Sequence, residues 1–194
     1  MPVVATYRDR LTACGVRSAA VTCLLAAAAA CGHPDPPAPG PRAPRVARPL
    51  FAGAATAYPC TALTDAQAVR AGAPAGARHR EVVGRDGPSC VWGYAAAGPV
   101  LTVAWPVDTP GLDALYARRG EQAYWAETTV LGYPAVFADT RDGRARGRCV
   151  LHVGVSDRTS FSAALDTRGT GPAGDACAAA RRAAISVLDG LRRQ

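Results

Sequence analysis

Three side chains late in the chain are of the types that form a nucleophile, a base and an orienting acid. His152 is followed by Asp157 and Ser160, which together suggest a Ser-His-Asp hydrolase. The chain has no Gly-x-Ser-x-Gly turn of the kind that usually presents such a serine. His152 also alternates with Leu151 and Val153, so it should face away from the apolar side of a strand. The pattern favours a half-buried structural histidine, and no catalytic residue is predicted.

A glycine-rich segment has the spacing of a dinucleotide-binding turn. Residues 169–174 read Gly-Thr-Gly-Pro-Ala-Gly, between an expected strand and an expected helix. The chain ends 20 residues later, so no strand follows to complete a βαβ unit, and Pro172 lacks a backbone N–H donor. We interpret the segment as a connection and predict no cofactor. No His-Glu-x-x-His or Cys-x-x-Cys spacing occurs, so no metal site is predicted.

The densest charge in the chain lies in residues 141–148. This segment holds four arginines, Arg141, Arg144, Arg146 and Arg148. Asp142-Gly143 is a strong turn signal, so we expect the arginines at a hairpin tip. Guanidinium groups bind phosphates and carboxylates in a bidentate manner, which makes these four residues candidate contacts for anionic lipid headgroups or envelope polymer. The other interpretation, a solvated loop as for most charge runs, is the one that we favour.

The overall charge does not indicate nucleic-acid binding. The formal net charge is +7, and all 22 basic residues are arginine. These arginines are spread along the chain, whereas nucleic-acid-binding proteins concentrate them on one face with aromatic residues between them. We therefore predict no nucleic-acid partner.

The N-terminus has the pattern of a signal peptide. Arg8, Arg10 and Arg17 precede an uncharged stretch of 13 residues, Ser18 to Ala30. A bilayer-spanning helix needs about 20 apolar residues, so this stretch is too short to span and fits a signal-peptide core. The sequence predicts a signal peptide over residues 1–30, and a translation start near Val16 stays open.

Cys31 follows the apolar core directly. Ala28-Ala29-Ala30-Cys31-Gly32 resembles a bacterial lipobox, which implies a diacylated Cys31 after export; an ordinary secretory cut after Ala30 is the alternative. Leu11-Thr12-Ala13-Cys14-Gly15 matches a lipobox better by residue type, but only ten residues precede it, too few for an apolar core. We expect lipidation at Cys31, which anchors the chain on the extracytoplasmic face of the cell membrane.

The segment after Cys31 is expected to be a tether. Seven prolines fall between His33 and Pro49, among alanine, glycine and arginine. Such a composition buries little apolar surface and favours extended geometry. We assign residues 31–57 to the lipidated cysteine and a disordered tether, and residues 58–194 to a single globular domain.

Four cysteines remain in the predicted domain: Cys60, Cys90, Cys149 and Cys177. In an exported domain they indicate two disulfides, for which three pairings exist. We favour Cys60 with Cys90 and Cys149 with Cys177, each closing a loop of about 30 residues that stabilises the fold by about 3–4 kcal/mol in the chain-entropy model.

The domain is expected to be α+β. Its sheet of about five or six mostly antiparallel strands should pack against N-terminal, middle and C-terminal helices. A capping box, Thr64 with Gln67, predicts a helix to about Ala71, and Thr109-Pro110 predicts a helix start. The expected strands are 89–96, 100–107, 127–131, 135–139, 148–156 and 159–167, and the last helix spans 175–193.

Several short motifs occur in order along the domain: Pro59-Cys60, Ser89-Cys90-Val91-Trp92, Gly111-Leu112-Asp113-Ala114-Leu115-Tyr116, Gly132-Tyr133-Pro134-Ala135-Val136, Cys149 with Val153-Gly154-Val155, and Asp175-Ala176-Cys177. Together they resemble the actinobacterial lipoprotein family called domain of unknown function 3558, over about residues 58 to 192. The family usually has an acidic residue where this chain has Tyr58. The resemblance implies an exported, lipid-anchored, disulfide-bonded domain and no particular activity.

These features together predict a non-enzymatic, lipid-anchored protein of the cell envelope that binds an unidentified ligand or partner. The alternative is a secreted hydrolase or accessory factor acting on envelope material. A pocket in which His152, Asp157 and Ser160 converge would favour the hydrolase, and an exposed apolar or arginine-lined groove would favour binding. A purely structural spacer would have neither.

Overall fold

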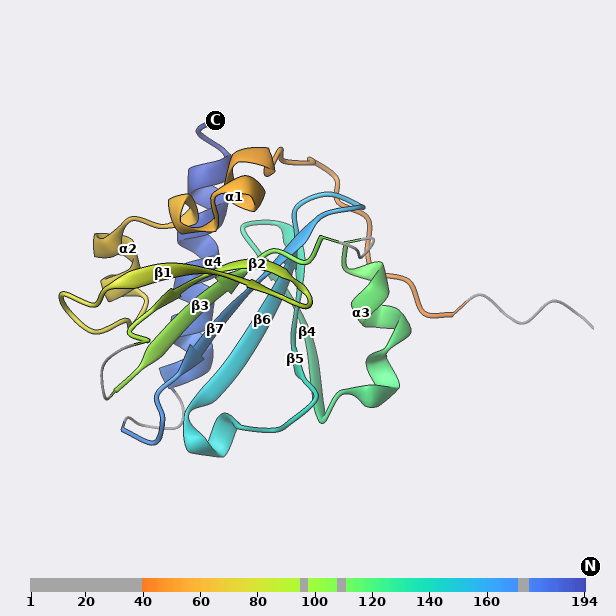
Figure 1. The fold of residues 1–194 in the computed structure, drawn as a ribbon. Helices are drawn as coiled ribbons and strands as arrows, with labels where there is room; N and C mark the ends of the chain where they lie inside the picture. Colours follow the sequence, from red (N-terminus) through yellow and green to blue (C-terminus); the bar gives the residue numbers. More distant parts are fainter. Residues whose placement is uncertain (1–39, 95–97, 108–110, 171–174) are drawn as a thin grey trace, which may run out of the picture. The chain divides into compact units, whose positions relative to one another are not determined.

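The centre of the domain is one antiparallel sheet of seven strands, in the order β1-β2-β3-β7-β6-β5-β4 (Figure 1). The computed structural model describes residues 40–94, 98–107, 111–170 and 175–194. The predicted signal peptide, Cys31 and the predicted helix start at Thr109-Pro110 lie outside these residues. The strands are β1 His79–Gly84, β2 Gly87–Trp92, β3 Val100–Ala104, β4 Tyr124–Val130, β5 Tyr133–Asp139, β6 Arg148–Gly154 and β7 Ser160–Asp166.

The predicted strand number is one too low. Each of the six expected strands overlaps a strand of the sheet, and the seventh, β1, has no counterpart in the prediction. β1 lies at the edge of the sheet, where five of its six residues are exposed and only Val82 is half-buried. An edge strand with polar residues on both faces lacks the alternation of apolar and polar residues by which a strand is predicted.

Helices and short 3-10 turns connect and cover the strands: α1 Gly53–Ala57, η1 Pro59–Ala62, α2 Asp65–Arg70, α3 Asp113–Ala117, η2 Arg119–Glu121, η3 Arg144–Arg146 and α4 Asp175–Leu191. The capping box that predicts α2 is present. The Gln67 backbone N–H donates to Thr64 Oγ1, and the Thr64 N–H donates to Gln67 Oε1 at 2.8 Å. The helix therefore begins where the sequence places it, because both donors are satisfied locally.

One face of the sheet forms the hydrophobic core with α4, which crosses behind the strands in Figure 1. Cys149, Leu151 and Val153 alternate on β6 toward this face, as the sequence predicts. The helix buries a stripe of apolar side chains, most of them alanines: Ala176, Ala179, Ala180, Ala183, Ala184, Val187 and Leu188. Alanine at this helical spacing lets the helix axis approach the sheet closely.

Two disulfides join the cysteine pairs that the sequence analysis favours. Cys60 is bonded to Cys90 with a Cα–Cα distance of 4.8 Å, and Cys149 to Cys177 with a Cα–Cα distance of 4.9 Å. The first fastens η1 to β2, and the second fastens the start of β6 to the first turn of α4. Both therefore clamp helical segments onto the sheet and close loops of 30 and 28 residues.

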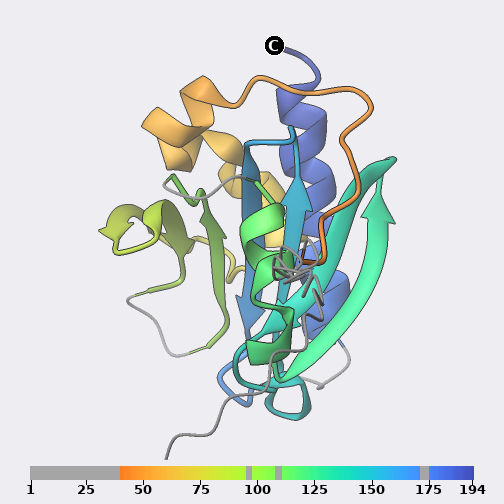
Figure 2. The ribbon, with the colours of Figure 1, turned by 90° about the vertical axis from the view of Figure 1, so that its right-hand side faces the viewer.

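The folded part begins before the predicted domain boundary at Tyr58. Residues 43–50, the N-terminal strap, lie along the sheet and pass over its end toward α1 (Figure 2). Val46 is buried, and the Leu50 N–H donates to the Val155 carbonyl at 2.8 Å. The strap and α1 thus belong to the domain, whereas the sequence predicts a tether over residues 31–57.

The second face of the sheet is only partly covered. Leu112, which precedes α3, packs against Gly154 of β6, and Tyr116 of α3 meets the Trp125 ring edge-on at 4.9 Å between centroids. These contacts place α3 over the β4–β6 side of this face. Between α3 and the turn that joins β1 to β2, the face is left as a groove. Among the described residues, no helix is both long enough and apolar enough to cross a bilayer.

Candidate functional site

The open-face groove is a hollow of about 480 Å³ on the second face of the sheet. Its floor is a row of cross-strand neighbours, one from each of four adjacent strands: Ser89, Ala104, Ser162 and His152. Three of these four side chains are small, so the floor lies low between its two walls. Leu112, Leu115 and Arg118 line the wall on the α3 side, and residues 84–87 line the opposite wall.

His152 is the titratable residue of the groove floor. Its Nε2–H donates to the Ala138 carbonyl oxygen at 3.2 Å, because a carbonyl can only accept. Burial lowers the pKa of His152 to about 4. The Ala138 carbonyl and the charge of Asp139 both raise this pKa, but the effect of burial is larger. The imidazole is therefore neutral at pH 7 and is fixed in one orientation by the backbone. As the sequence predicts, the histidine is half-buried and faces away from Leu151 and Val153.

The structure does not bring His152, Asp157 and Ser160 together as a Ser-His-Asp group. His152 and Ser160 both line the groove, but Asp157 does not. Asp157 instead holds the N-terminal strap: Oδ1 accepts the Val46 N–H at 3.0 Å, and Oδ2 pairs with Arg45 at 2.7 Å. The Val46 N–H and then Arg45 hold the pKa of Asp157 below its usual range. In the described residues no hydrogen bond joins Asp157 to His152, so the histidine lacks the acid that would orient it.

The groove combines apolar surface with a few fixed polar groups. Ala104, Pro106 and Leu115 supply apolar area, while the hydroxyls of Ser160 and Ser162 and the neutral His152 supply hydrogen-bonding groups. Charged side chains lie at its edges, among them Arg118, Asp139 and Arg148. This composition is typical of a binding site in which a few polar groups orient a mainly apolar ligand.

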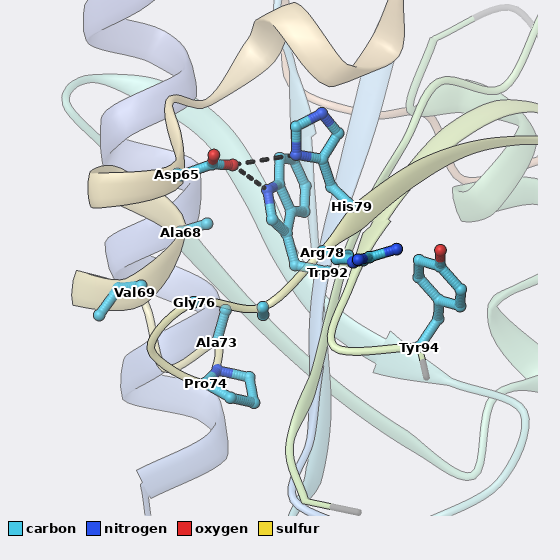
Figure 3. Close-up of a pocket in the computed structure, with 11 residues that line it drawn as sticks. Asp65, Ala68, Val69, Ala73, Pro74, Gly76, Arg78, His79, Trp92 and Tyr94 are labelled. Atoms are coloured by element: carbon cyan, nitrogen blue, oxygen red, sulfur yellow. Dashed lines mark hydrogen bonds and ion pairs between the residues drawn. The ribbon is translucent and has the colours of Figure 1, made fainter. Parts of the chain in front are cut away.

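A second hollow, of about 510 Å³, lies between α2, β1 and the end of β2 (Figure 3). Asp65, the first residue of α2, accepts the Nδ1–H of His79 at 2.9 Å and the Nε1–H of Trp92 at 3.3 Å. One carboxylate oxygen thus ties the helix to β1 and β2. Trp92 is buried, so its ring gives a ligand no stacking surface. We interpret the three residues as a structural cluster.

The four arginines of the predicted run do not all line the same hollow. Arg141, Arg146 and Arg148 line one hollow of about 620 Å³, which we call the arginine pocket. Arg144 does not line it, since its guanidinium pairs with both carboxylate oxygens of Asp142, at 2.9 and 2.7 Å, and lies over the Tyr124 ring. As predicted, these residues lie at the tip of a hairpin, in the connection between β5 and the start of β6. Gly143 has φ −95°, so the connection is not a two-residue Asp-Gly turn but a longer loop with the 3-10 turn η3.

A fourth arginine of the pocket, Arg168, was not predicted. It follows β7, 20 residues after Arg148, the last residue of the run, and lines the same hollow with Asp166. Arg148 at the start of β6 pairs in register with Asp166 at the end of β7, which brings the two loops together. The antiparallel pairing of two consecutive predicted strands could have indicated this neighbourhood. No local signal could have placed Asp65 beside Trp92, 27 residues away.

The described residues contain no group of three or more His, Cys, Asp or Glu side chains arranged to hold a metal ion. The glycine-rich segment 169–174 is described only as far as Thr170, and its remaining residues lie outside the described part.

Comparison with known proteins places the chain in a family. The profile of the family described as "Protein of unknown function (DUF3558)" matches residues 10–189, nearly the whole chain. No curated protein sequence and no solved structure matches the chain significantly.

Proposed function

The chain belongs to the DUF3558 family, and we propose that this member is a lipid-anchored, non-catalytic binding protein on the extracytoplasmic face of the cell membrane. Its anchor is Cys31, and its ligand site is the open-face groove. The family description names no function, so the proposal rests on this chain's own residues.

The observation that carries the binding role is the cross-strand row of small residues that ends at His152. Ser89, Ala104 and Ser162 leave space on a sheet face that larger side chains would fill. His152 is held neutral and already donates its Nε2–H to a backbone carbonyl. Such a residue orients a ligand by hydrogen bonding rather than by exchanging protons near pH 7.

The proposed location is supported by the two disulfides and by the N-terminal sequence. Disulfides form and persist in exported proteins and are rare in reducing compartments. Cys31 stands directly after the apolar stretch Ser18 to Ala30, where a lipobox cysteine would be modified. A diacylglyceryl group supplies two acyl chains, enough for stable membrane attachment.

The anchor is tested by fractionating cells that express the native protein or Cys31→Ala. We expect the native protein in the membrane fraction, with a mass that includes the acyl chains, and the variant in the soluble exported fraction. A variant that stays as membrane-bound as the native protein would refute the anchor. The matched variant Cys14→Ala removes the competing cysteine and should leave the distribution unchanged.

The groove is tested by native mass spectrometry of the protein purified from its own membranes. We expect an additional bound mass that is lost in Ser162→Trp, because the indole would fill the middle of the groove floor. Thr129→Trp is the matched control, since Thr129 is exposed on β4 and does not line the groove. Equal retention of the bound mass in both variants would exclude the groove as the ligand site.

A secreted hydrolase, the alternative function, would need a base oriented for Ser160. His152 shares the groove with Ser160, but Asp157 is engaged by Val46 and Arg45, so these three residues do not form a Ser-His-Asp group. For this reason we do not propose hydrolysis.

A further inference from the structure

We propose that the arginine pocket is a second binding site, specific for a phosphate group, and that Arg141, Arg146 and Arg168 contact the ligand. The pocket lies between the β5–β6 connection and the turn after β7. None of its residues lines the open-face groove except Arg148, so the proposal does not rest on the groove or on Cys31.

The charges around the pocket are unbalanced. Among the described residues of the two loops and the adjoining strand ends, there are five arginines (141, 144, 146, 148 and 168) and three aspartates (139, 142 and 166), an excess of two positive charges. All three aspartates are paired with arginines: Asp142 with Arg144 at 2.7 Å, and Asp139 and Asp166 with Arg148 at 3.0 and 3.9 Å. In the described part of the chain, Arg141 and Arg146 make no ion pair.

The walls of the pocket leave room for a ligand. Besides the arginines and Asp166, the lining consists of Gly143, Ala145 and Gly169. A Cβ atom built on Gly169 would meet no other atom of the described residues within 4 Å, so the described part of the chain leaves this side of the pocket open. Small residues among long cationic side chains let an anion reach several guanidinium groups at once, which neighbouring bulky side chains would prevent.

A phosphate suits this arrangement better than a single carboxylate. The excess of two positive charges matches a phosphate monoester, which carries a charge of about −1.5 to −2 at pH 7. Guanidinium groups bind phosphate oxygens in bidentate pairs, and groups from two loops can bind different oxygens of one phosphate. Arg141 and Arg146 come from one loop and Arg168 from the other. The phosphate can belong to a lipid headgroup or to a soluble or polymeric ligand.

The proposal is tested by isothermal titration calorimetry of the purified full chain with pyrophosphate at low and high salt. We expect binding that weakens with salt, and a Kd about tenfold higher in Arg141→Ala and in Arg146→Ala. Both side chains are exposed and without ion pairs in the described residues, so the variants should keep the wild-type Tm.

Two controls separate a site from general charge. Arg158→Ala removes one positive charge at the opposite end of the β6–β7 hairpin and should leave the Kd unchanged. The double variant Asp142→Asn with Arg144→Gln removes a neutral ion pair from the same loop and should also bind normally. Absence of pyrophosphate binding, or an equal loss in Arg158→Ala, would overturn the proposal.

Vesicles distinguish the source of the phosphate. If vesicles of phosphatidylglycerol, but not of phosphatidylcholine, compete with pyrophosphate, the ligand is a lipid headgroup. If neither competes while pyrophosphate still binds, the ligand is soluble or polymeric. Both results support a phosphate site, and neither depends on the Ser162→Trp result, so the two proposals can fail separately.

Discussion

Replacing His152 by glutamine should remove most of the loss of stability that the protein suffers between pH 7.5 and pH 5. In the folded protein, burial lowers the pKa of His152 to about 4, from an ordinary value of 6.5. Well above pH 6.5 the histidine is neutral in both the folded and the unfolded chain and adds no pH dependence. Between pH 6.5 and about 4 only the unfolded chain binds the proton, so the free energy of unfolding falls as the pH falls.

The size of the effect follows from the gap between the two pKa values. A difference of one pKa unit is worth about 1.4 kcal/mol, so the full gap corresponds to about 3 kcal/mol, reached below pH 4. At pH 5 the same linkage gives about 2 kcal/mol. Part of His152 is open to the groove, so solvent screening makes about 2 kcal/mol the upper value that we expect at pH 5.

The measurement is urea unfolding followed by tryptophan fluorescence at pH 7.5, 6 and 5, since Trp92 and Trp105 are buried and report the loss of packing. Glutamine can still donate an N–H to the Ala138 carbonyl but does not titrate. The pKa of Asp142 is lowered to about 2, and that of Asp157 is lowered too. The stability that these two carboxylates contribute is therefore lost only in more acidic solution. His79→Gln is the matched control for losing an imidazole. Parallel pH profiles for the native protein and His152→Gln would refute the reasoning.

Two further predictions concern a turn and the strap. Gly147 has φ +78°, and a Cβ there would overlap the Thr167 hydroxyl, whereas Gly169 has φ +75° and open space around it. Gly169→Ala should therefore cost about 1 kcal/mol from backbone strain alone, and Gly147→Ala at least about 1 kcal/mol more, by urea unfolding; equal costs would contradict the clash. Asp157→Ala removes the acceptor of a strap N–H, so amide hydrogen exchange should accelerate at least about tenfold in the strap and stay unchanged in β6. Unchanged exchange in the strap would show that Asp157 does not hold it.

The parts of the fold that could be predicted are those with a local or periodic signal. The alternation of β6 and β7 and the capping box of Thr64 depend on residues close in sequence, and all are present. Each disulfide joins two cysteines that follow one another in the sequence, so the preference for short loops gave the correct pairing. For the capping box and for the two alternating strands, the signal lies within the segment from which the element is predicted.

The parts that could not be predicted depend on partners far away in sequence. The strap is proline-rich, and its order comes from two carboxylates, Asp113 and Asp157, that accept its N–H groups from 70 and 111 residues away. Composition indicates only an extended chain there, which is correct for its geometry but gives no sign of docking. In the same way, Arg168 joins the arginine pocket only because β7 pairs with β6.

Docking of the strap shortens the part of the chain that would link the domain to a lipid on Cys31. If Cys31 carries the lipid, 11 residues, from Gly32 to Arg42, separate it from the strap, compared with 26 in the predicted tether. At a maximum of about 3.6 Å per residue, the reach falls from about 90 Å to about 40 Å. The strap is held at the β6–β7 turn by Asp157, whereas the arginine pocket lies at the other end of these strands, about 20 Å away at 3.3 Å per residue. A reach of about 40 Å exceeds the length of about 20 Å between the two ends of these strands, so such a tether would let either end of the sheet approach the anchoring membrane. The competition with phosphatidylglycerol vesicles therefore tests a contact that an anchored protein could also make.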